Sequence, residues 1–167
     1  VRADKSAQIK AALKWAAEQK LRIVIVGGAD SWRLADDIAK AKVPVIYTAI
    51  VNIPRRDTED YDTYYKAPGI LEKAGVKVAL AYGGEPGHTR NLPDFAGRAA
   101  AYGMAPEGAL RAITLTPAEI LGVDKRLGSI EVGKDATFIV TDGDILDTRT
   151  HILRAFIQGR EVDLNDR

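Results

Sequence analysis

The sequence contains no cysteine and only two histidines among its 167 residues. Without thiols the chain cannot form disulfides, use a thiol nucleophile or build a Cys-based zinc site. It also lacks an excess of charge of one sign, since 24 basic residues stand against 23 acidic ones. We therefore expect no nucleic-acid partner and no anionic-membrane surface. The longest apolar run, 21–26, contains Arg22 and is too short to span a membrane.

Alternating strand and helix patterns occupy the first part of the chain. The segments 21–26, 43–48 and 76–81 are rich in apolar and β-branched residues, which is typical of strands buried on both faces of a parallel sheet. Segments with apolar residues at helical spacing lie between them. This alternation predicts an α/β fold, either a (β/α)8 barrel or a doubly wound sheet. The predicted helices are 4–19, 29–40, 68–74, 92–102, 106–113 and 117–121.

Local signals refine some of these predicted boundaries. Asp4 or Ser6 is expected to cap the first helix, because a short side-chain oxygen can accept from the free amides of the first turn. Thr116 before Pro117 is expected to start the last helix in the same way. The polar segment 51–66 carries three tyrosines and is predicted to be a long surface loop.

The pattern changes near residue 125 to short strands. These are predicted at 128–132, 136–140, 152–157 and 160–162, with a hairpin signal, Gln158-Gly159, between the last two. We therefore expect two units, 1–124 and 125–167. The chain opens with VRAD directly before a helix, which is typical of the end of a strand whose beginning is missing. From this start we expect a fragment or a processed chain.

A glycine-rich loop lies within residues 79–92, ALAYGGEPGHTRNL, after one predicted strand and before a helix. It contains Glu85 and His88, which are three residues apart and could bind one metal together or act as an acid–base pair. The alternative is that both are loop side chains without a special role. Arg90 could hold a substrate carboxylate through two hydrogen bonds, or pair with a neighbouring acid.

Three runs in the C-terminal part have a more specific pattern. They read AITLTPAEILGV at 112–123, RLGSIEVGKDATFIVTDGD at 126–144 and FIQGREV at 156–162. These runs closely resemble the end of the amidohydrolase superfamily, and the nearest branch is the imidazolonepropionase-like one. Upstream, IVGG at 25–28 and RNLP at 90–93 are similar to the same branch. The resemblance extends over the whole chain.

This resemblance implies a fold class within α/β. The chain would be the second half of a metal-dependent-hydrolase TIM (β/α)8 barrel, from the end of the fifth strand, plus C-terminal strands of the accompanying small β-sandwich. A barrel alone takes about 250 residues. The first four strands, with the His-x-His metal motif that they carry in the family, would be absent. The N-terminal half of the same protein, or another chain, would complete the barrel.

The resemblance also implies hydrolysis of C–N bonds with one or two divalent metals that lower the pKa of a bound water. In the family this half supplies a His after strand five, a His after strand six and an Asp after strand eight. Here Arg2 and Gly27 stand at the two His positions, and the Asp position falls within residues 82–84 without a carboxylate. Neither Arg nor Gly can replace a His ligand. We therefore expect an altered metal site, no metal ligand in this chain, and a divalent metal such as zinc only with ligands from the missing N-terminal half.

We predict Glu85 and His88 as catalytic residues, and Arg90, Arg2 and Tyr82 as substrate-binding residues. A fixed cation at Arg2 could partly replace a metal electrostatically. The predicted function is hydrolysis of a small non-peptide amide, a lactam, or an N-acyl or dipeptide-like substrate. The alternative is a non-catalytic ligand-binding or assembly module derived from an amidohydrolase. Because half a barrel leaves sheet edges unpaired, we expect a homo-oligomer or a completing partner chain. The sequence leaves the compartment open between cytoplasmic and exported.

Overall fold

The computed structural model describes residues 1–84 and 86–164. Four short strands form one sheet in chain order, and all three neighbouring pairs are parallel. Each parallel step needs a crossover connection, and helices supply these connections. The predicted parallel α/β arrangement is therefore confirmed. The strands are β1 Arg2–Ala3, β2 Ile25–Gly27, β3 Val45–Tyr47 and β4 Val78–Leu80.

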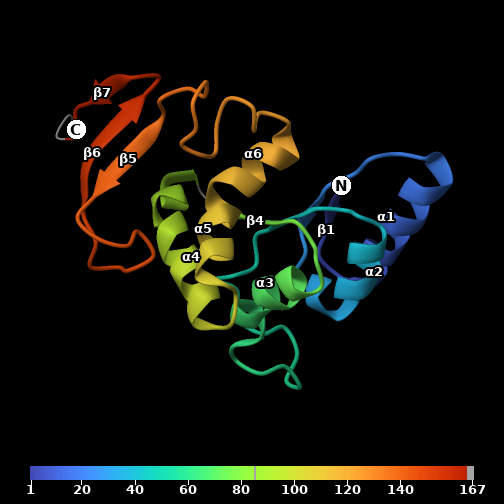
Figure 1. Cartoon of the computed structure of the whole chain (residues 1–167). Helices are drawn as coiled ribbons and strands as arrows, with labels where there is room; N and C mark the ends of the chain where they lie inside the picture. Colours follow the sequence, from blue (N-terminus) through green and yellow to red (C-terminus); the bar gives the residue numbers. More distant parts are fainter. Residues whose placement is uncertain (85, 165–167) are drawn as a thin grey trace.

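Helices alternate with these strands and then continue after β4 (Figure 1). Helices α4 to α6 lie between β4 and the C-terminal strands in Figure 1. No helix in the described part of the chain is long and apolar enough to cross a membrane. The helices are α1 Ser6–Gln19, η1 Ser31–Leu34, α2 Ala35–Lys40, α3 Thr63–Lys73, η2 Pro86–Asn91, α4 Leu92–Ala101, α5 Pro106–Ile113 and α6 Leu115–Leu121.

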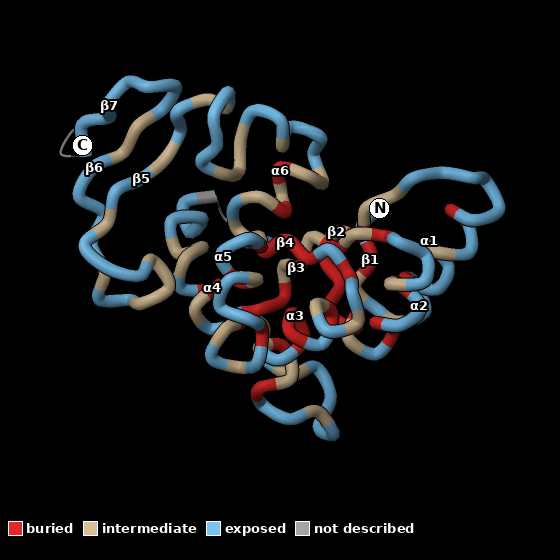
Figure 2. The backbone as a smooth tube through the Cα atoms, in the orientation of Figure 1, coloured by how far each residue is buried: buried red, intermediate tan, exposed pale blue. Residues whose placement is uncertain are grey.

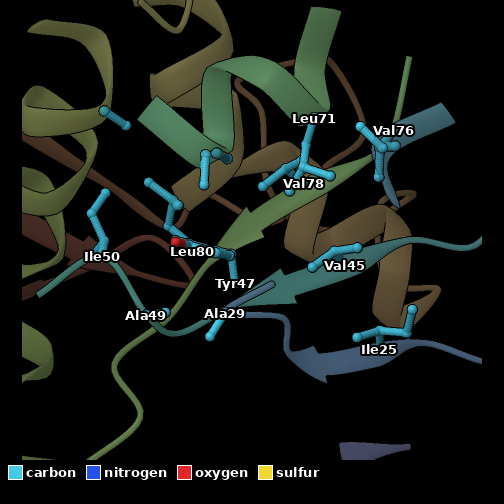
Figure 3. Close-up of a cluster of buried hydrophobic side chains, with 14 of the residues drawn as sticks. Ile25, Ala29, Val45, Tyr47, Ala49, Ile50, Leu71, Val76, Val78 and Leu80 are labelled. Atoms are coloured by element: carbon cyan, nitrogen blue, oxygen red, sulfur yellow. The ribbon is translucent and has the colours of Figure 1, made fainter. Parts of the chain in front are cut away.

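The two faces of the parallel sheet differ in burial. Ile25, Val45 and Val78 share one register row and are fully or almost fully buried. Figure 3 shows these side chains in one apolar cluster, and Figure 2 shows that the buried segments concentrate on the strands and the helices beside them. The alternate row begins at the exposed Arg2, which pairs with the half-buried Val26. The apolar core therefore lies mainly on one face, and Arg2 belongs to the other.

The C-terminal strands form a separate antiparallel sheet of β5 Phe138–Thr141, β6 Ile152–Ile157 and β7 Arg160–Val162. The strand predicted at 128–132 is wrong, because this segment has no strand pairing in the structure. Ile130 and Val132 are 84% and 107% exposed, so burial does not favour an extended conformation for this segment. Their β-branched character alone does not make a strand without a partner.

The predicted cap of α1 is also wrong. Lys5 is the N-cap residue, and the Gln8 side chain accepts from the backbone N–H groups of Asp4 and Lys5 at 3.0 Å each. The Ser6 N–H donates instead to the carboxylate of Asp30, at 2.9 Å. Asp30, which is distant in sequence, thus accepts the hydrogen bond that the prediction assigned to a capping side chain at the helix start. The Asp4 carboxylate does not cap the helix.

Helix α3 begins five residues before the predicted start, so Tyr64 and Tyr65 belong to a helix rather than to the loop. Pro68 misled the prediction, because proline is most common at a helix start. Inside α3 it has no N–H to donate to the carbonyl of Tyr64, four residues earlier. The buried hydroxyl of Tyr47 donates to that carbonyl at 3.1 Å instead. The tertiary contact therefore replaces the missing helical hydrogen bond.

We expect Tyr47→Phe to lower the free energy of unfolding by about 1–3 kcal/mol, because it leaves the Tyr64 carbonyl buried without a donor. Denaturant unfolding measures this loss. Tyr65→Phe is the matched control, since the Tyr65 hydroxyl has no hydrogen bond within residues 1–84 and 86–164. It should change stability by less than about 0.5 kcal/mol. Equal effects of the two substitutions would contradict this role of Tyr47.

The start predicted for α6 at Thr116-Pro117 is wrong by two residues. The helix begins at Leu115, and Thr114 is the N-cap residue. Pro117 is therefore the third helical residue rather than the first. The first turn of a helix does not use its N–H groups, so proline is tolerated there as well. The sequence pattern located the first turn of the helix correctly but not its first residue.

Candidate functional site

The carboxyl ends of the four parallel strands form one edge of the sheet. The connections that leave this edge begin at Asp4, Gly28, Thr48 and Ala81. Ligands of parallel α/β folds bind at the carboxyl ends of the strands, because the loops there face a common space. The candidate site is therefore expected among the residues that follow β1, β2, β3 and β4.

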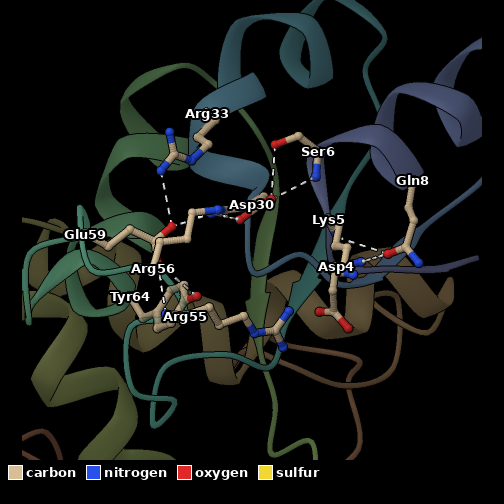
Figure 4. Close-up of polar contacts among 10 residues, drawn as sticks. All are labelled: Asp4, Lys5, Ser6, Gln8, Asp30, Arg33, Arg55, Arg56, Glu59 and Tyr64. Carbon is tan, nitrogen blue, oxygen red and sulfur yellow. Dashed lines mark hydrogen bonds and ion pairs between the residues drawn. The ribbon is translucent and has the colours of Figure 1, made fainter.

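Asp30, in the connection after β2, lies at the centre of a polar cluster at this edge (Figure 4). The residue is 1% exposed. Its carboxylate accepts from the backbone N–H and the hydroxyl of Ser6, at 2.9 and 3.2 Å. It also accepts from both terminal nitrogens of Arg56, at 2.9 and 2.8 Å. Asp30 therefore links the loop after β3, through Arg56, to the start of α1, through Ser6.

Glu59 completes this cluster from the same loop after β3. Its side chain is 1% exposed and accepts from the guanidinium groups of Arg56 and Arg33, the latter at 3.2 Å. It also accepts from the backbone N–H of Arg55 at 3.0 Å. Arg56 therefore bridges two buried carboxylates. The segment 51–62 is held over the carboxyl edge of the sheet by these ion pairs.

The cluster stabilises the ionised forms of its two carboxylates. Hydrogen bonds from Arg56 lower the pKa of Asp30 to about 2, against the opposing effect of burial. Burial opposes ionisation of Glu59, but hydrogen bonds from Arg56, Arg55 and Arg33 outweigh it and keep the pKa of Glu59 below its ordinary value. Both groups thus stay charged near neutral pH and have their acceptor positions occupied. They are suited to positioning the loop rather than to transferring protons.

A pH dependence of stability follows from Asp30. Its folded pKa of about 2 lies below its ordinary value of 3.8. The ionised Asp30 therefore contributes its full stabilisation of the folded state above its unfolded pKa, and this contribution is lost as the pH falls from about 4 towards 2. We expect the difference in unfolding free energy between the wild type and Asp30→Asn to shrink over this window. Denaturant unfolding between pH 2 and 6 tests this, and a constant difference would contradict it.

Tyr82 and His88, two of the predicted site residues, lie together after β4. Their ring centroids are 5.4 Å apart, and Tyr82 also stacks on Phe95 at 5.9 Å. His88 and Arg90 are exposed residues of η2. Glu85 lies outside the described residues, so the expected pairing of Glu85 with His88 stays a prediction. The contact with the Tyr82 ring positions the imidazole of His88 at the carboxyl edge.

Arg2 lies apart from this group. It is exposed on β1, and β1 and β4 are the two outer strands of the four-stranded sheet. Tyr82 follows β4, so the structure does not bring Arg2 beside Tyr82 and His88 within the sheet. The predicted substrate-binding residues are thus distributed over both ends of the carboxyl edge.

The described residues do not form a complete metal site among themselves. Within residues 1–84 and 86–164, no group of three or more His, Cys, Asp or Glu side chains is arranged to hold a cation. Gly27, at one expected His position, has a φ of +109°. A Cβ there would lie 2.6 Å from Oδ1 of Asp4. The carboxylate of Asp4 therefore occupies space that a side chain at position 27 would need.

Four charged residues at this edge were not predicted as site residues from the sequence. Asp4 follows the predicted strand end at the start of the chain, and Asp30 lies four residues after the predicted strand 21–26, so their place near strand ends could have identified them. Arg56 and Glu59 belong to a polar loop in which nothing local distinguishes a buried ion pair from a solvated one. Their partners are up to 26 residues away in sequence.

A cavity of about 830 Å³ lies at the opposite end of the sheet. It is lined by residues that precede the strands, among them Arg22, Pro44 and Lys77. The ion pair between Lys77 and Glu119, at 2.7 Å, closes one side of it. Because this is the amino end of the strands, we do not assign it as the candidate active site.

Comparison with known proteins identifies the relatives of this chain. The model of the amidohydrolase family matches residues 9–164. The N-acetylglucosamine-6-phosphate deacetylase of Bos taurus is 40% identical over 62 residues, which are 37% of this chain and 14% of that protein. The imidazolonepropionase of Pseudomonas fluorescens is 40% identical over 74 residues, 41% of this chain and 18% of that protein.

Among solved structures, an amidohydrolase from Thermotoga maritima MSB8 superposes with a TM-score of 0.84 at 31% identity. The match covers 96% of this chain and 42% of that one. A prolidase solved in complex with N-methylphosphonate-L-proline superposes with a TM-score of 0.67 at 20% identity, covering 96% of this chain and 44% of that one, which shows a common fold. The chain thus spans less than half of the length of these relatives.

Proposed function

On the premise that this chain belongs to the amidohydrolase family, we propose that it forms part of a hydrolase that cleaves C–N bonds of small molecules. The observation that carries the proposal is the carboxyl edge of the parallel sheet. There, the segment 51–62 is held over the strand ends by Arg56, and His88 follows β4. The relatives named as deacetylase and imidazolonepropionase support the class of bond.

The four parallel strands would be the second half of a TIM (β/α)8 barrel, within a unit 1–124. The antiparallel strands β5 to β7 would belong to a small β-sandwich, within a unit 125–167. The match to 42% of the Thermotoga maritima chain supports this assignment. The N-terminal half of the same protein, or another chain, would cover the second face of the sheet. A second copy of the chain would be the basis of a homo-oligomer.

The chemistry assigned to this half uses its own side chains. His88 would transfer a proton, because a neutral imidazole can accept or donate near neutral pH. Glu85 would be its partner in this role. Arg90 and Arg2 would hold an anionic group of the substrate, and the ring of Tyr82 would contact its apolar part. A divalent metal would need ligands from outside this half.

Hydrolysis assays on the full-length protein test this proposal. The substrates are lactams, N-acyl amino acids and dipeptides, with metal content measured on the same preparation. We expect turnover of at least one class and a loss of at least about 100-fold in kcat for His88→Ala, the range of a general acid–base group. His151→Ala is the control, because His151 pairs with Asp142 at the C-terminal sheet. If the folded full-length protein hydrolysed none of these substrates, the proposal that it is a hydrolase would be rejected.

The second candidate is a non-catalytic ligand-binding or assembly module. It is favoured by Arg2 and Gly27 at expected ligand positions, and by the carboxylate of Asp4 beside Gly27. The two candidates differ in an observable result. A binding module would retain ligand binding without turnover, and His88→Ala would leave that binding unchanged within about twofold.

A further inference from the structure

Asp4 and Arg55 carry opposite charges at the carboxyl edge and stand outside the paired cluster around Asp30. Asp4 and Arg55 make no ion pair and no side-chain hydrogen bond within the part of the chain that the structure describes. Their neighbours differ in this respect, since Ser6 binds Asp30 and Arg56 bridges Asp30 to Glu59. Unpartnered charges beside a fully paired cluster are candidates for ligand binding.

Asp4 is held in place through its backbone. Its N–H donates to the side chain of Gln8 at 3.0 Å, and its carbonyl accepts from the N–H of Asp30 at 2.8 Å. The residue is half-buried at the end of β1. Its carboxylate lies beside Gly27, where no side chain competes for space. The acid is thus preorganised, and a ligand that binds it need not order the backbone.

Arg55 is positioned by the anchored segment 51–62. Its backbone N–H donates to the buried Glu59 at 3.0 Å, and the next residue, Arg56, forms the ion pairs with Asp30. Figure 4 shows the Arg55 side chain extending from this segment towards the end of β1, where Asp4 lies.

Asp4 and Arg55 both act electrostatically on the buried hydroxyl of Tyr47. Burial raises the pKa of Tyr47 most, and the charge of Tyr64 raises it further. The charge of Arg55 lowers this pKa and the charge of Asp4 raises it.

We propose that Asp4 and Arg55 form a recognition site for a small zwitterionic ligand. Asp4 would bind a cationic nitrogen, and Arg55 would bind a carboxylate, which the planar guanidinium can hold through two hydrogen bonds. An isolated anion or cation would satisfy only one of the two charges. The proposal deepens the proposed function by narrowing its substrate to a dipeptide-like zwitterion, and it rests on that function for the position of the site.

Isothermal titration calorimetry on the full-length protein tests this site without requiring turnover. The probes are glycine, glycylglycine and triglycine, which separate the two charges by increasing lengths. N-acetylglycylglycine and glycylglycine amide each lack one charge. We expect saturable binding of at least one zwitterion, with at least tenfold weaker binding of the analogue capped at either end. Binding of no zwitterion, or equal binding of capped and uncapped forms, would overturn the proposal.

Single substitutions assign the two charges. Arg55→Gln is expected to weaken zwitterion binding at least tenfold and to leave the amide-capped probe unaffected. Asp4→Asn should weaken zwitterion binding equally and leave the N-acetylated probe unaffected. The controls are Arg22→Gln, at the amino end of the sheet, and Asp57→Asn, an exposed acid of the same loop. They should change affinity by less than twofold.

Two further outcomes separate this proposal from its alternatives. If Asp4 and Arg55 served only each other, each substitution and the double variant would lower the unfolding midpoint by the same amount without changing affinity. That result would overturn the recognition site. Turnover of an uncharged lactam without zwitterion binding would also reject it while supporting the hydrolase. Zwitterion binding without turnover would support the site and reject the hydrolase.

Discussion

Asp30→Ala is expected to lower the free energy of unfolding by about 1.5–3 kcal/mol, the range for charge-assisted hydrogen bonds, because the half-exposed Arg56 stays paired with Glu59. The substitution removes four hydrogen-bond contacts, two from Ser6 and two from Arg56. It also leaves Glu59 as the remaining buried acid facing Arg56. Denaturant unfolding of the wild type and the variant measures the loss. A loss below about 1 kcal/mol would show that the contacts of Asp30 contribute little to stability, because water can replace them.

The control for Asp30→Ala is Asp57→Ala, an exposed acid in the anchored segment. It should change stability by less than about 0.5 kcal/mol. Trypsin supplies a second, local measurement, because it cleaves after Arg56. When Asp30 no longer holds Arg56, the segment 51–62 should be cut faster in the variant than in the wild type under native conditions. Equal cleavage rates would mean that other contacts hold the segment.

The parallel sheet could be predicted from the sequence because its signal is local. The strand segments around Ile25, Val45 and Val78 are apolar on both faces, and glycine or proline bounds them. Errors arose where a tertiary contact decided the outcome. Helix α3 continues through Pro68 because Tyr47 donates to the carbonyl that Pro68 leaves without a helical donor. Ile130 is 84% exposed and belongs to no strand within residues 1–84 and 86–164. Neither outcome is visible from the residues nearby.

The candidate site was predictable only in its position. The family resemblance and the strand pattern both directed attention to the carboxyl ends of the strands, and His88 with Tyr82 does lie there. The charged residues that organise the edge were not identified. Asp30, Arg56 and Glu59 come from two connections, and their charges resemble those of any solvated loop. A buried carboxylate is recognised by what surrounds it, which the sequence does not state.

Gly27→His, which places an imidazole at the position where the family resemblance expects a ligand, is expected to destabilise the chain by about 2–6 kcal/mol. A non-glycine residue at a φ of +109° costs about 1–3 kcal/mol. Its Cβ would also lie 2.6 Å from Asp4 Oδ1. Relieving such overpacking costs a further 1–3 kcal/mol, roughly. Denaturant unfolding measures the sum.

Two variants separate these contributions. Gly75→Ala introduces a side chain at a φ of +86° with nothing within 4 Å of its Cβ, so it reports the backbone strain alone. Asp4→Ala combined with Gly27→His removes the steric conflict but keeps the strain. If the double variant were no more stable than Gly27→His alone, the carboxylate of Asp4 would not be the obstacle.

The same variants test whether the Asp4 carboxylate affects the affinity of this edge for a metal ion. Gly27→His adds one imidazole donor, but Arg2 still stands at the other expected His position and carries a fixed positive charge. A cation repels a metal and cannot donate an electron pair to it. We therefore expect zinc titration to show no gain in affinity for Gly27→His, with or without Asp4→Ala. Arg2, Asp4 and Gly27 lie at neighbouring strand ends. Placing a histidine at position 27 alone therefore cannot create a set of metal ligands there. Tighter zinc binding by the single variant would show instead that the edge still has the geometry of a metal site.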